Sequence, residues 1–353
     1  MADGSVAGTT KIDGDLPMRK TRRTGIDKLH RLLFGQDLRI TEGEPYCQVR
    51  PFDFAADFEP RHLTKPLSAP AGEVFDIRTF GADPAAEDNA AAVQQAVDAA
   101  AKVGGTVLVD GGSYPMSTVE LRSGVTLFIT PGSFLAARPD GKGFRHKALL
   151  YGRDLTNVTL TGGGGLEGEG HRFGLRPALP QNCTKPADLI DVIEMRRTYR
   201  AQLRFAHPSK YGGLLCLEQC QGVHIHHFLF QNSAHWTCRL QMCRDVLVEY
   251  AAIRNNRNVA NADGFDIVGG QDLTLRHCMV STADDGFVFK HAVWLGSSGE
   301  MRHILIEDCR VDSRTSCIKL GTETPWPITD VTVRRCRLER QDLYPGAVSG
   351  ISV

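Results

Sequence analysis

The sequence predicts an all-β fold, a parallel β-helix in which short strands wind into stacked coils behind an N-terminal capping helix. Three observations support this prediction. Short apolar runs return at regular intervals, a second ladder of aligned runs accompanies them, and only one convincing helical pattern is found. Repeated units that each contact only their neighbours are typical of solenoids, which grow along one axis without dividing into separate cores.

The first 73 residues are predicted to be a weakly structured N-terminal extension, and residues 74–353 to form the β-helix. The extension is rich in Arg, Lys, Pro and Gly, and residues 26–34 have the pattern of a short amphipathic helix. Such a basic segment is typical of a solvated extension, with targeting or anion binding as the alternative.

The capping helix is predicted from about Asp88 to Lys102. Val93, Val97 and Ala100 fall on one face of this segment, and two glycines follow it. Since no other convincing helix alternates with the β runs, the sequence excludes a fold of alternating strands and helices.

Short apolar runs then recur to the end of the chain. Five of them begin, at intervals of 23, 27, 31 and 27 residues, at Val223, Val246, Leu273, Ile304 and Val331. A period of this length without helices is the signature of a parallel β-helix. Cys278, Cys309 and Cys336 each follow five residues after the start of a run, so we expect an interior cysteine ladder and no disulfides or metal ligands among them.

A second ladder begins at Asp263, Asp285, Ser316 and Ser349. Because side chains alternate along a strand, one column is predicted to point inward and consists of Phe265, Phe287, Ile318 and Ile351. The intervening column is predicted to face outward along an open groove and consists of Asp266, Val288, Lys319 and Ser352. No capping element follows Val353, so we expect the β-helix to lack its C-terminal coils and to self-associate through that uncapped edge.

Charge and hydropathy exclude several classes of partner. Lys and Arg number 41 and Asp and Glu number 41, so no overall field selects nucleic acid. No apolar stretch approaches the roughly 20 residues of a membrane span, and residues 1–17 lack the apolar core of a secretory signal. The sequence therefore predicts no nucleic-acid or membrane partner and no signal peptide, and it leaves the location open.

Three aspartates carry the candidate chemistry. Coils about 4.8 Å apart would nearly superpose Asp263 and Asp285, with Asp284 beside them. Carboxylates this close cannot all ionise freely, so one should hold its proton while the others stay charged. Such a pair of acid and base suits hydrolysis of a glycosidic bond, and an open groove suits a polymer. Turn capping and calcium binding are the alternatives.

These residues resemble glycoside hydrolase family 28, the polygalacturonase-like enzymes, whose fold is a right-handed parallel β-helix. Residues 261–266 are similar to the family motif Asn-Thr-Asp-Gly-x-Asp, and residues 284–286 are similar to its Asp-Asp-Cys. Residues 75–83, the capping helix and residues 104–109 are similar to its first coil. The resemblance extends over roughly residues 74 to 353.

The resemblance implies an inverting hydrolase of pectin-like, galacturonide-containing polysaccharides or oligosaccharides. Asp284 would protonate the leaving oxygen while Asp263 and Asp285 activate water, with no metal and no cofactor. Beside these aspartates we expect substrate contacts from Asn261, Lys319, Lys290, His291 and Arg239. Trp236 is expected to be a core aromatic, with a sugar-stacking role as the alternative.

Two positions depart from the family pattern. Ser316 stands where polygalacturonases carry a histidine, and Ser352 stands where they carry an arginine. Two alternatives therefore stay open. One is a polysaccharide lyase or epimerase that uses calcium at the aspartates and Lys319 as a base; the other is a catalytically impaired, carbohydrate-binding β-helix.

Overall fold

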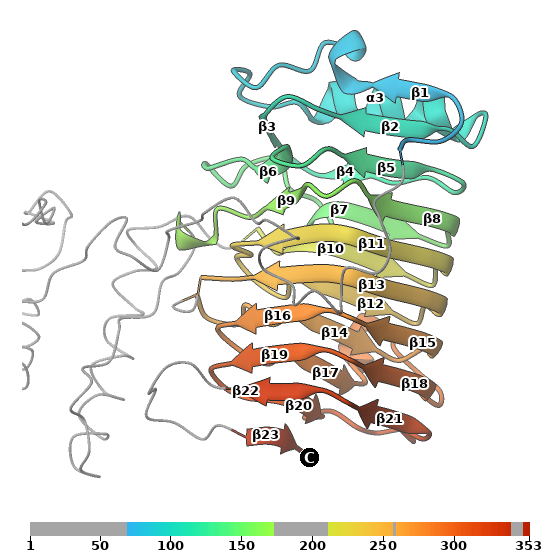
Figure 1. Cartoon of the computed structure of the whole chain (residues 1–353), viewed down its shortest axis with the longest axis vertical. Helices are drawn as coiled ribbons and strands as arrows, with labels where there is room; N and C mark the ends of the chain where they lie inside the picture. The colour runs from blue at the N-terminus through green and yellow to red at the C-terminus, as the bar shows by residue number, and fades with distance from the viewer. Residues whose placement is uncertain (1–68, 173–210, 257–258, 340–348) are drawn as a thin grey trace, which may run out of the picture.

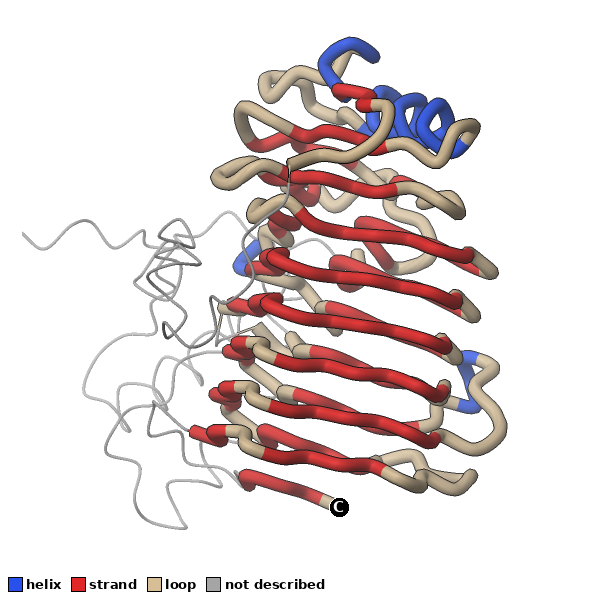
Figure 2. The backbone as a smooth tube through the Cα atoms, turned by 45° about the vertical axis from the view of Figure 1, so that its right-hand side comes forward, coloured by secondary structure: helices blue, strands red, loops and turns tan. Residues whose placement is uncertain are grey.

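The computed structural model describes residues 69–172, 211–256, 259–339 and 349–353, and the statements below concern these residues. The chain winds into coils stacked along one axis, with helix α3 at one end and strand β23 at the other (Figure 1). Strands of successive coils lie side by side and pair in parallel (Figure 2). The predicted right-handed parallel β-helix is confirmed. The helix predicted within residues 26–34 lies outside the described residues.

Two hydrogen-bonded sheets form the walls of the coils. The longer path of the first sheet consists of β1 (Val74–Asp76), β2 (Thr106–Val109), β5 (Thr126–Ile129), β8 (Thr156–Thr161), β11 (Gln221–Gln231), β13 (Arg244–Arg254), β15 (Gln271–Arg276), β18 (Arg302–Glu307) and β21 (Val331–Arg334). Its side branches are β3 (Ser113–Met116), β6 (Phe134–Ala137), β9 (Gly165–Glu167), β16 (Met279–Thr282), β19 (Arg310–Ser313) and β22 (Arg337–Glu339).

The second sheet carries the candidate site. Its strands are β4 (Val119–Glu120), β7 (Ala148–Arg153), β10 (Gly213–Glu218), β12 (Cys238–Gln241), β14 (Phe265–Val268), β17 (Phe287–Lys290), β20 (Ser316–Leu320) and β23 (Ser349–Ser352). The described helical elements are α3 (Ala90–Ala101) and three short 3-10 helices, η3 (Ile77–Phe80), η4 (Gly170–Arg172) and η5 (Val293–Leu295). Among the described residues, no helix is long and apolar enough to cross a membrane.

The core is the column of side chains inside the coils. Phe265 and Phe287, paired in register across β14 and β17, are fully buried and stack with ring centroids 5.4 Å apart. Cys278 and Cys309 are buried and Cys336 packs against the core, which confirms the cysteine ladder. Each fully buried phenylalanine contributes about 1.5–3 kcal/mol by leaving water, so stacking identical columns stabilises every coil boundary.

Helix α3 caps the first coil by packing its apolar face on β1, β2 and β4. It begins two residues later than the sequence predicted, because Asp88 lies just outside the helix. The Asp88 carboxylate accepts hydrogen bonds from the backbone N–H groups of Ala90 and Ser117. Covering the coil end with a helix protects strand edges that would otherwise pair with another chain.

The predicted open groove is wrong at two positions. Asp266 and Val288 lie on the outward side of their strands, as the register requires, but both are buried. Over Asp266 the cause is visible, because Lys290 reaches back along the strand to it and the Trp236 ring lies against the Lys290 ammonium. Long side chains thus close over a column that strand alternation alone leaves open.

Candidate active site

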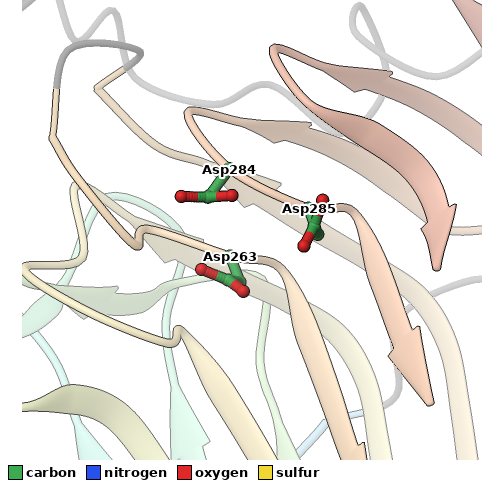
Figure 3. A group of neighbouring side chains, drawn as sticks. All are labelled: Asp263, Asp284 and Asp285. Atoms are coloured by element: carbon green, nitrogen blue, oxygen red, sulfur yellow. The ribbon is translucent and has the colours of Figure 1, made fainter. Parts of the chain in front are cut away.

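The three aspartates converge where the chain turns into two neighbouring strands. Asp263 precedes β14, while Asp284 and Asp285 precede β17, and the pairing of Phe265 with Phe287 places Asp263 and Asp285 at the same position of successive coils. One carboxylate oxygen of each residue lies within 4.8 Å of one from each of the others (Figure 3). The structure therefore brings together the three residues that the sequence singled out.

The glycine after each stacked aspartate explains why the coils approach so closely here. A Cβ on Gly264 would lie 2.3 Å from the carbonyl oxygen of Gly286, and one on Gly286 would lie 2.5 Å from that of Cys317. Gly264 instead donates its N–H to the Asp285 carbonyl at 2.8 Å. The Asp-Gly pairs therefore let successive turns stack with their carboxylates aligned.

Asp285 is surrounded by donors. Its Oδ2 accepts a hydrogen bond from Lys319 Nζ at 2.7 Å, and its Oδ1 accepts from Thr315 Oγ1 at 2.7 Å and from the Ser316 N–H at 3.1 Å. Burial opposes the charge on Lys319, but the hydrogen bond and the attraction of Asp285 outweigh it and raise the lysine pKa. Ser316 thus serves the site through its backbone, where the family pattern has a histidine.

Asp284 is the most accessible of the three aspartates. It is half-buried, whereas Asp263 and Asp285 are 4% and 3% exposed. Its Oδ2 accepts from the Asn261 N–H at 3.2 Å and its Oδ1 from Thr315 Oγ1 at 3.1 Å. Asn261 therefore contacts the site through its backbone, and its predicted role in substrate binding stays a prediction.

Asp263 has the opposite environment. Its Oδ1 is buried with no hydrogen-bond partner among the described residues. Burial, followed by repulsion from Asp266 and Asp284, raises the pKa of Asp263 well above its usual value. A buried carboxyl group with a raised pKa therefore lies beside one that is paired with a cation, and the predicted division of protons within the cluster stays a prediction.

Two of the basic residues that are predicted to contact substrate already form ion pairs with the protein. Lys290 Nζ lies 2.9 Å from Asp266 Oδ1, and Arg239 Nη2 lies 2.9 Å from Glu218 Oε1. Arg239 pairs in register with Asp266, as expected from the coil alignment. Their predicted contacts with substrate, like that of Lys319, stay predictions.

His291 directly follows strand β17 in the chain and is fully buried. Its Nδ1 lies 3.1 Å from Ser297 Oγ, and its ring packs edge-on against Trp326 with centroids 5.5 Å apart. Burial lowers the pKa of His291, which leaves the ring neutral at neutral pH. Its predicted role in substrate binding also stays a prediction.

The expectation that Trp236 is a core aromatic is wrong. Its side chain is half-buried on the outward side, and Lys290 Nζ lies 3.5 Å from the ring centroid. Trp294 of η5 is 64% exposed, and its ring centroid lies 6.1 Å from that of Trp236. The sequence did not predict Trp294 or Thr315, because Trp294 lies in the 3-10 helix η5 and Thr315 in a bend, both outside the aligned ladders. Thr315 directly precedes the Ser316 ladder position, which was the available signal.

Three carboxylates this close are also a donor set that suits a hard cation such as calcium. One of them, however, already accepts the Lys319 ammonium, which occupies an oxygen and supplies the positive charge that an ion would bring. The residues therefore fit an acid/base cluster at least as well as a metal centre.

Asp266 gives a prediction about pH. Burial raises its pKa to about 6 despite the opposing attraction of Lys290. An unfolded aspartate titrates near 3.9, so the folded protein binds this proton more tightly. The stabilisation from the proton is complete below about pH 4 and is lost as the pH rises through about 6. We expect Asp266→Asn to reduce the difference between the unfolding free energies at about pH 4 and about pH 7, measured with urea; an unchanged difference would contradict the assignment.

Comparison with known proteins defines the class. The family model for Glycosyl hydrolases family 28 matches residues 105–293, which is more than half of the chain and contains all three aspartates. The chain belongs to glycoside hydrolase family 28. A curated relative, polygalacturonase QRT2 of Arabidopsis thaliana, is 23% identical over 239 aligned residues, and the match covers 64% of this chain and 47% of the relative. The chain thus spans about half the length of that relative.

Two solved structures have the same fold. The hyperthermoactive exopolygalacturonase of Thermotoga maritima is 20% identical with a TM-score of 0.58, over 76% of this chain and 68% of that one. The polygalacturonase of Erwinia carotovora ssp. carotovora is 16% identical with a TM-score of 0.58, over 82% of this chain and 78% of that one. At these identities the likeness shows the fold alone.

Proposed function

We propose that the chain hydrolyses glycosidic bonds of a pectin-like polysaccharide or oligosaccharide by acid/base catalysis. Family membership supports the reaction class. The observation that carries the proposal is the convergence of three carboxyl groups in three different environments. Asp263 has a buried oxygen with no hydrogen-bond partner among the described residues, Asp285 is paired with Lys319, and Asp284 is half-buried.

Asp284 is proposed as the acid that protonates the leaving oxygen, because it is the most accessible of the three. Burial and repulsion from Asp284 favour a proton on Asp263. Because the two carboxyl groups are coupled, the pair shares that proton, which can pass to Asp284. Once the proton lies on Asp284, Asp263 and Asp285 are proposed to orient and deprotonate water for a single displacement. The oxygens lie within 4.8 Å, a gap that one water can bridge with two hydrogen bonds.

The short gap also favours a competitor, a retaining mechanism. Carboxyl groups that flank a substrate with water between them are usually about 6.5–9.5 Å apart, whereas retaining pairs are about 5–5.5 Å apart. Here we expect inversion. Asp263 and Asp285 occupy equivalent positions of stacked coils, so both would face the same side of the substrate and could bind one water molecule together.

The test is hydrolysis of pectic oligosaccharides followed by proton NMR. We expect new reducing ends whose first-formed anomer is opposite to that of the cleaved bond. A first-formed anomer of the same configuration would replace the single displacement with the retaining mechanism. An unsaturated product that absorbs in the ultraviolet, and that is lost on chelation, would instead identify a lyase. We do not expect that product, because the raised pKa of Lys319 makes this residue a poor base for proton abstraction.

A further inference from the structure

Three cations on the outward side of the second sheet are already neutralised by neighbouring coils. Arg239 of β12 pairs with Glu218 of β10 at 2.9 Å. Lys290 of β17 pairs with Asp266 of β14 at 2.9 Å, and Lys319 of β20 pairs with Asp285 at 2.7 Å. Each of these charges is therefore committed to a protein carboxylate before any substrate binds.

The charge balance around the aspartates disfavours an anionic sugar. The carboxyl groups of Glu218, Asp263, Asp266, Asp284 and Asp285 accompany these three cations and Arg153 of β7, whose Nη1 lies 3.9 Å from Glu218 Oε2. With a proton on Asp263, the remaining carboxylates and these cations are equal in number, so no positive charge is left over for a substrate. A uronate carboxylate would have to displace a protein carboxylate from its cationic partner, which costs binding energy.

An aromatic surface lies beside the same ion pairs. Trp236 packs on Lys290, and Trp294 continues the surface into solvent with 64% of its area exposed. The turn that presents Trp294 is anchored, because Gln241 Nε2 donates to the Leu295 carbonyl at 2.6 Å. A flat, exposed indole removes apolar area from water when the C–H face of a sugar ring covers it, with no charge required.

We propose that the Trp236–Trp294 surface binds an uncharged sugar unit, so that the chain acts on neutral or esterified parts of its substrate in preference to free galacturonate. The preference in cleavage rests on the proposed function. The preference in binding depends only on the tryptophans and the ion pairs. The polar groups of a neutral sugar can then be satisfied by hydrogen bonds alone, without breaking an ion pair.

The test compares galacturonate oligosaccharides with the same oligosaccharides after methyl esterification, which removes the charge and keeps the linkage. Binding is measured by tryptophan fluorescence on the Asp284→Asn variant, so that little substrate is consumed during the titration. We expect the esters to bind at least about tenfold more tightly than the acids, which corresponds to about 1.4 kcal/mol. Tighter binding of the free acids, weakening as salt is added, would overturn the inference, as would binding of neither series.

Two variants assign the effect to residues. Trp294→Ala should weaken ester binding about tenfold without lowering Tm. The control is Val103→Ala, which shortens another exposed apolar side chain at the capped end and should change neither the ester affinity nor Tm. Glu218→Gln frees Arg239 and should raise the affinity for free galacturonate. If Trp294→Ala binds the esters like the wild type, or if Glu218→Gln gains no affinity for the acids, the proposed surface is wrong.

Hydrolysis by the unmodified protein separates this inference from the proposed function. Cleavage of esters in preference to acids supports both. Preferential cleavage of free galacturonate overturns the specificity and leaves the hydrolase proposal standing. Binding of esters without cleavage of either series supports the binding surface and contradicts the proposed hydrolase.

Discussion

Replacing Asp284 by Asn is expected to lower kcat by about 10²- to 10⁴-fold, the usual contribution of a positioned acid or base. Asparagine keeps the shape of the side chain. Its amide oxygen can still accept from the Asn261 N–H, and its NH2 group can donate to Thr315 Oγ1 in place of the bond that Asp284 accepts. It has no acidic proton to donate to the leaving oxygen. The loss should therefore fall on kcat, while KM and the free energy of unfolding stay close to those of the wild type.

A matched control is Asp154→Asn, which makes the same chemical change on a side chain that is 68% exposed. That variant should hydrolyse substrate at the wild-type rate. Wild-type turnover by Asp284→Asn would assign the acid to another group, and the raised pKa of Asp263 makes it the next candidate. Asp263→Asn, assayed in parallel, would then show the larger loss.

The second large effect is expected on stability. Replacing Lys290 by Met should lower the free energy of unfolding by about 3–5 kcal/mol, because it leaves a buried carboxylate without its cation. Asp266 is fully buried and Lys290 is 8% exposed, so little water can replace the ammonium. Methionine keeps most of the volume of the lysine chain, which limits any contribution from a cavity. Urea unfolding monitored by circular dichroism measures the change.

The double variant Asp266→Asn with Lys290→Met removes both charges and should recover most of the lost stability. If the single Lys290→Met variant is as stable as the wild type, the ion pair does not compensate the burial of Asp266. If the double variant is no more stable than the single one, the loss comes from packing rather than from charge.

The repeat made the fold and the stacked aspartates predictable from sequence. Side-chain alternation along each strand, combined with identical inward residues, fixed the register that pairs Phe265 with Phe287 and therefore places Asp263 over Asp285. Arg239 beside Asp266 followed from the same alignment. Regular backbone geometry transmits such information from one coil to the next without any knowledge of the turns.

Side-chain partners could not be predicted in the same way. The register gives the column of Lys290 but not the direction of its flexible chain, which reaches back to Asp266 and under the Trp236 ring. Trp294 lies in a turn whose length varies from coil to coil, so no repeat predicts where its ring lies. The donation from the Ser316 N–H to Asp285 is equally invisible, because it depends on backbone direction and not on residue type.

The three ion pairs have a mechanical consequence, because each one joins a coil to its neighbour. In a one-dimensional array, opening propagates across boundaries, and the boundaries that carry these bridges resist it more than those held by apolar contact alone. None of the three spans the β12–β14 boundary, where Arg276 of β15 instead pairs with Glu249 of β13 at 2.8 Å. The stretch from β10 to β20 should therefore open as a single block, with its amide hydrogens exchanging together. The aspartate cluster, which is assembled from separate turns, would then keep its geometry until the whole block comes apart.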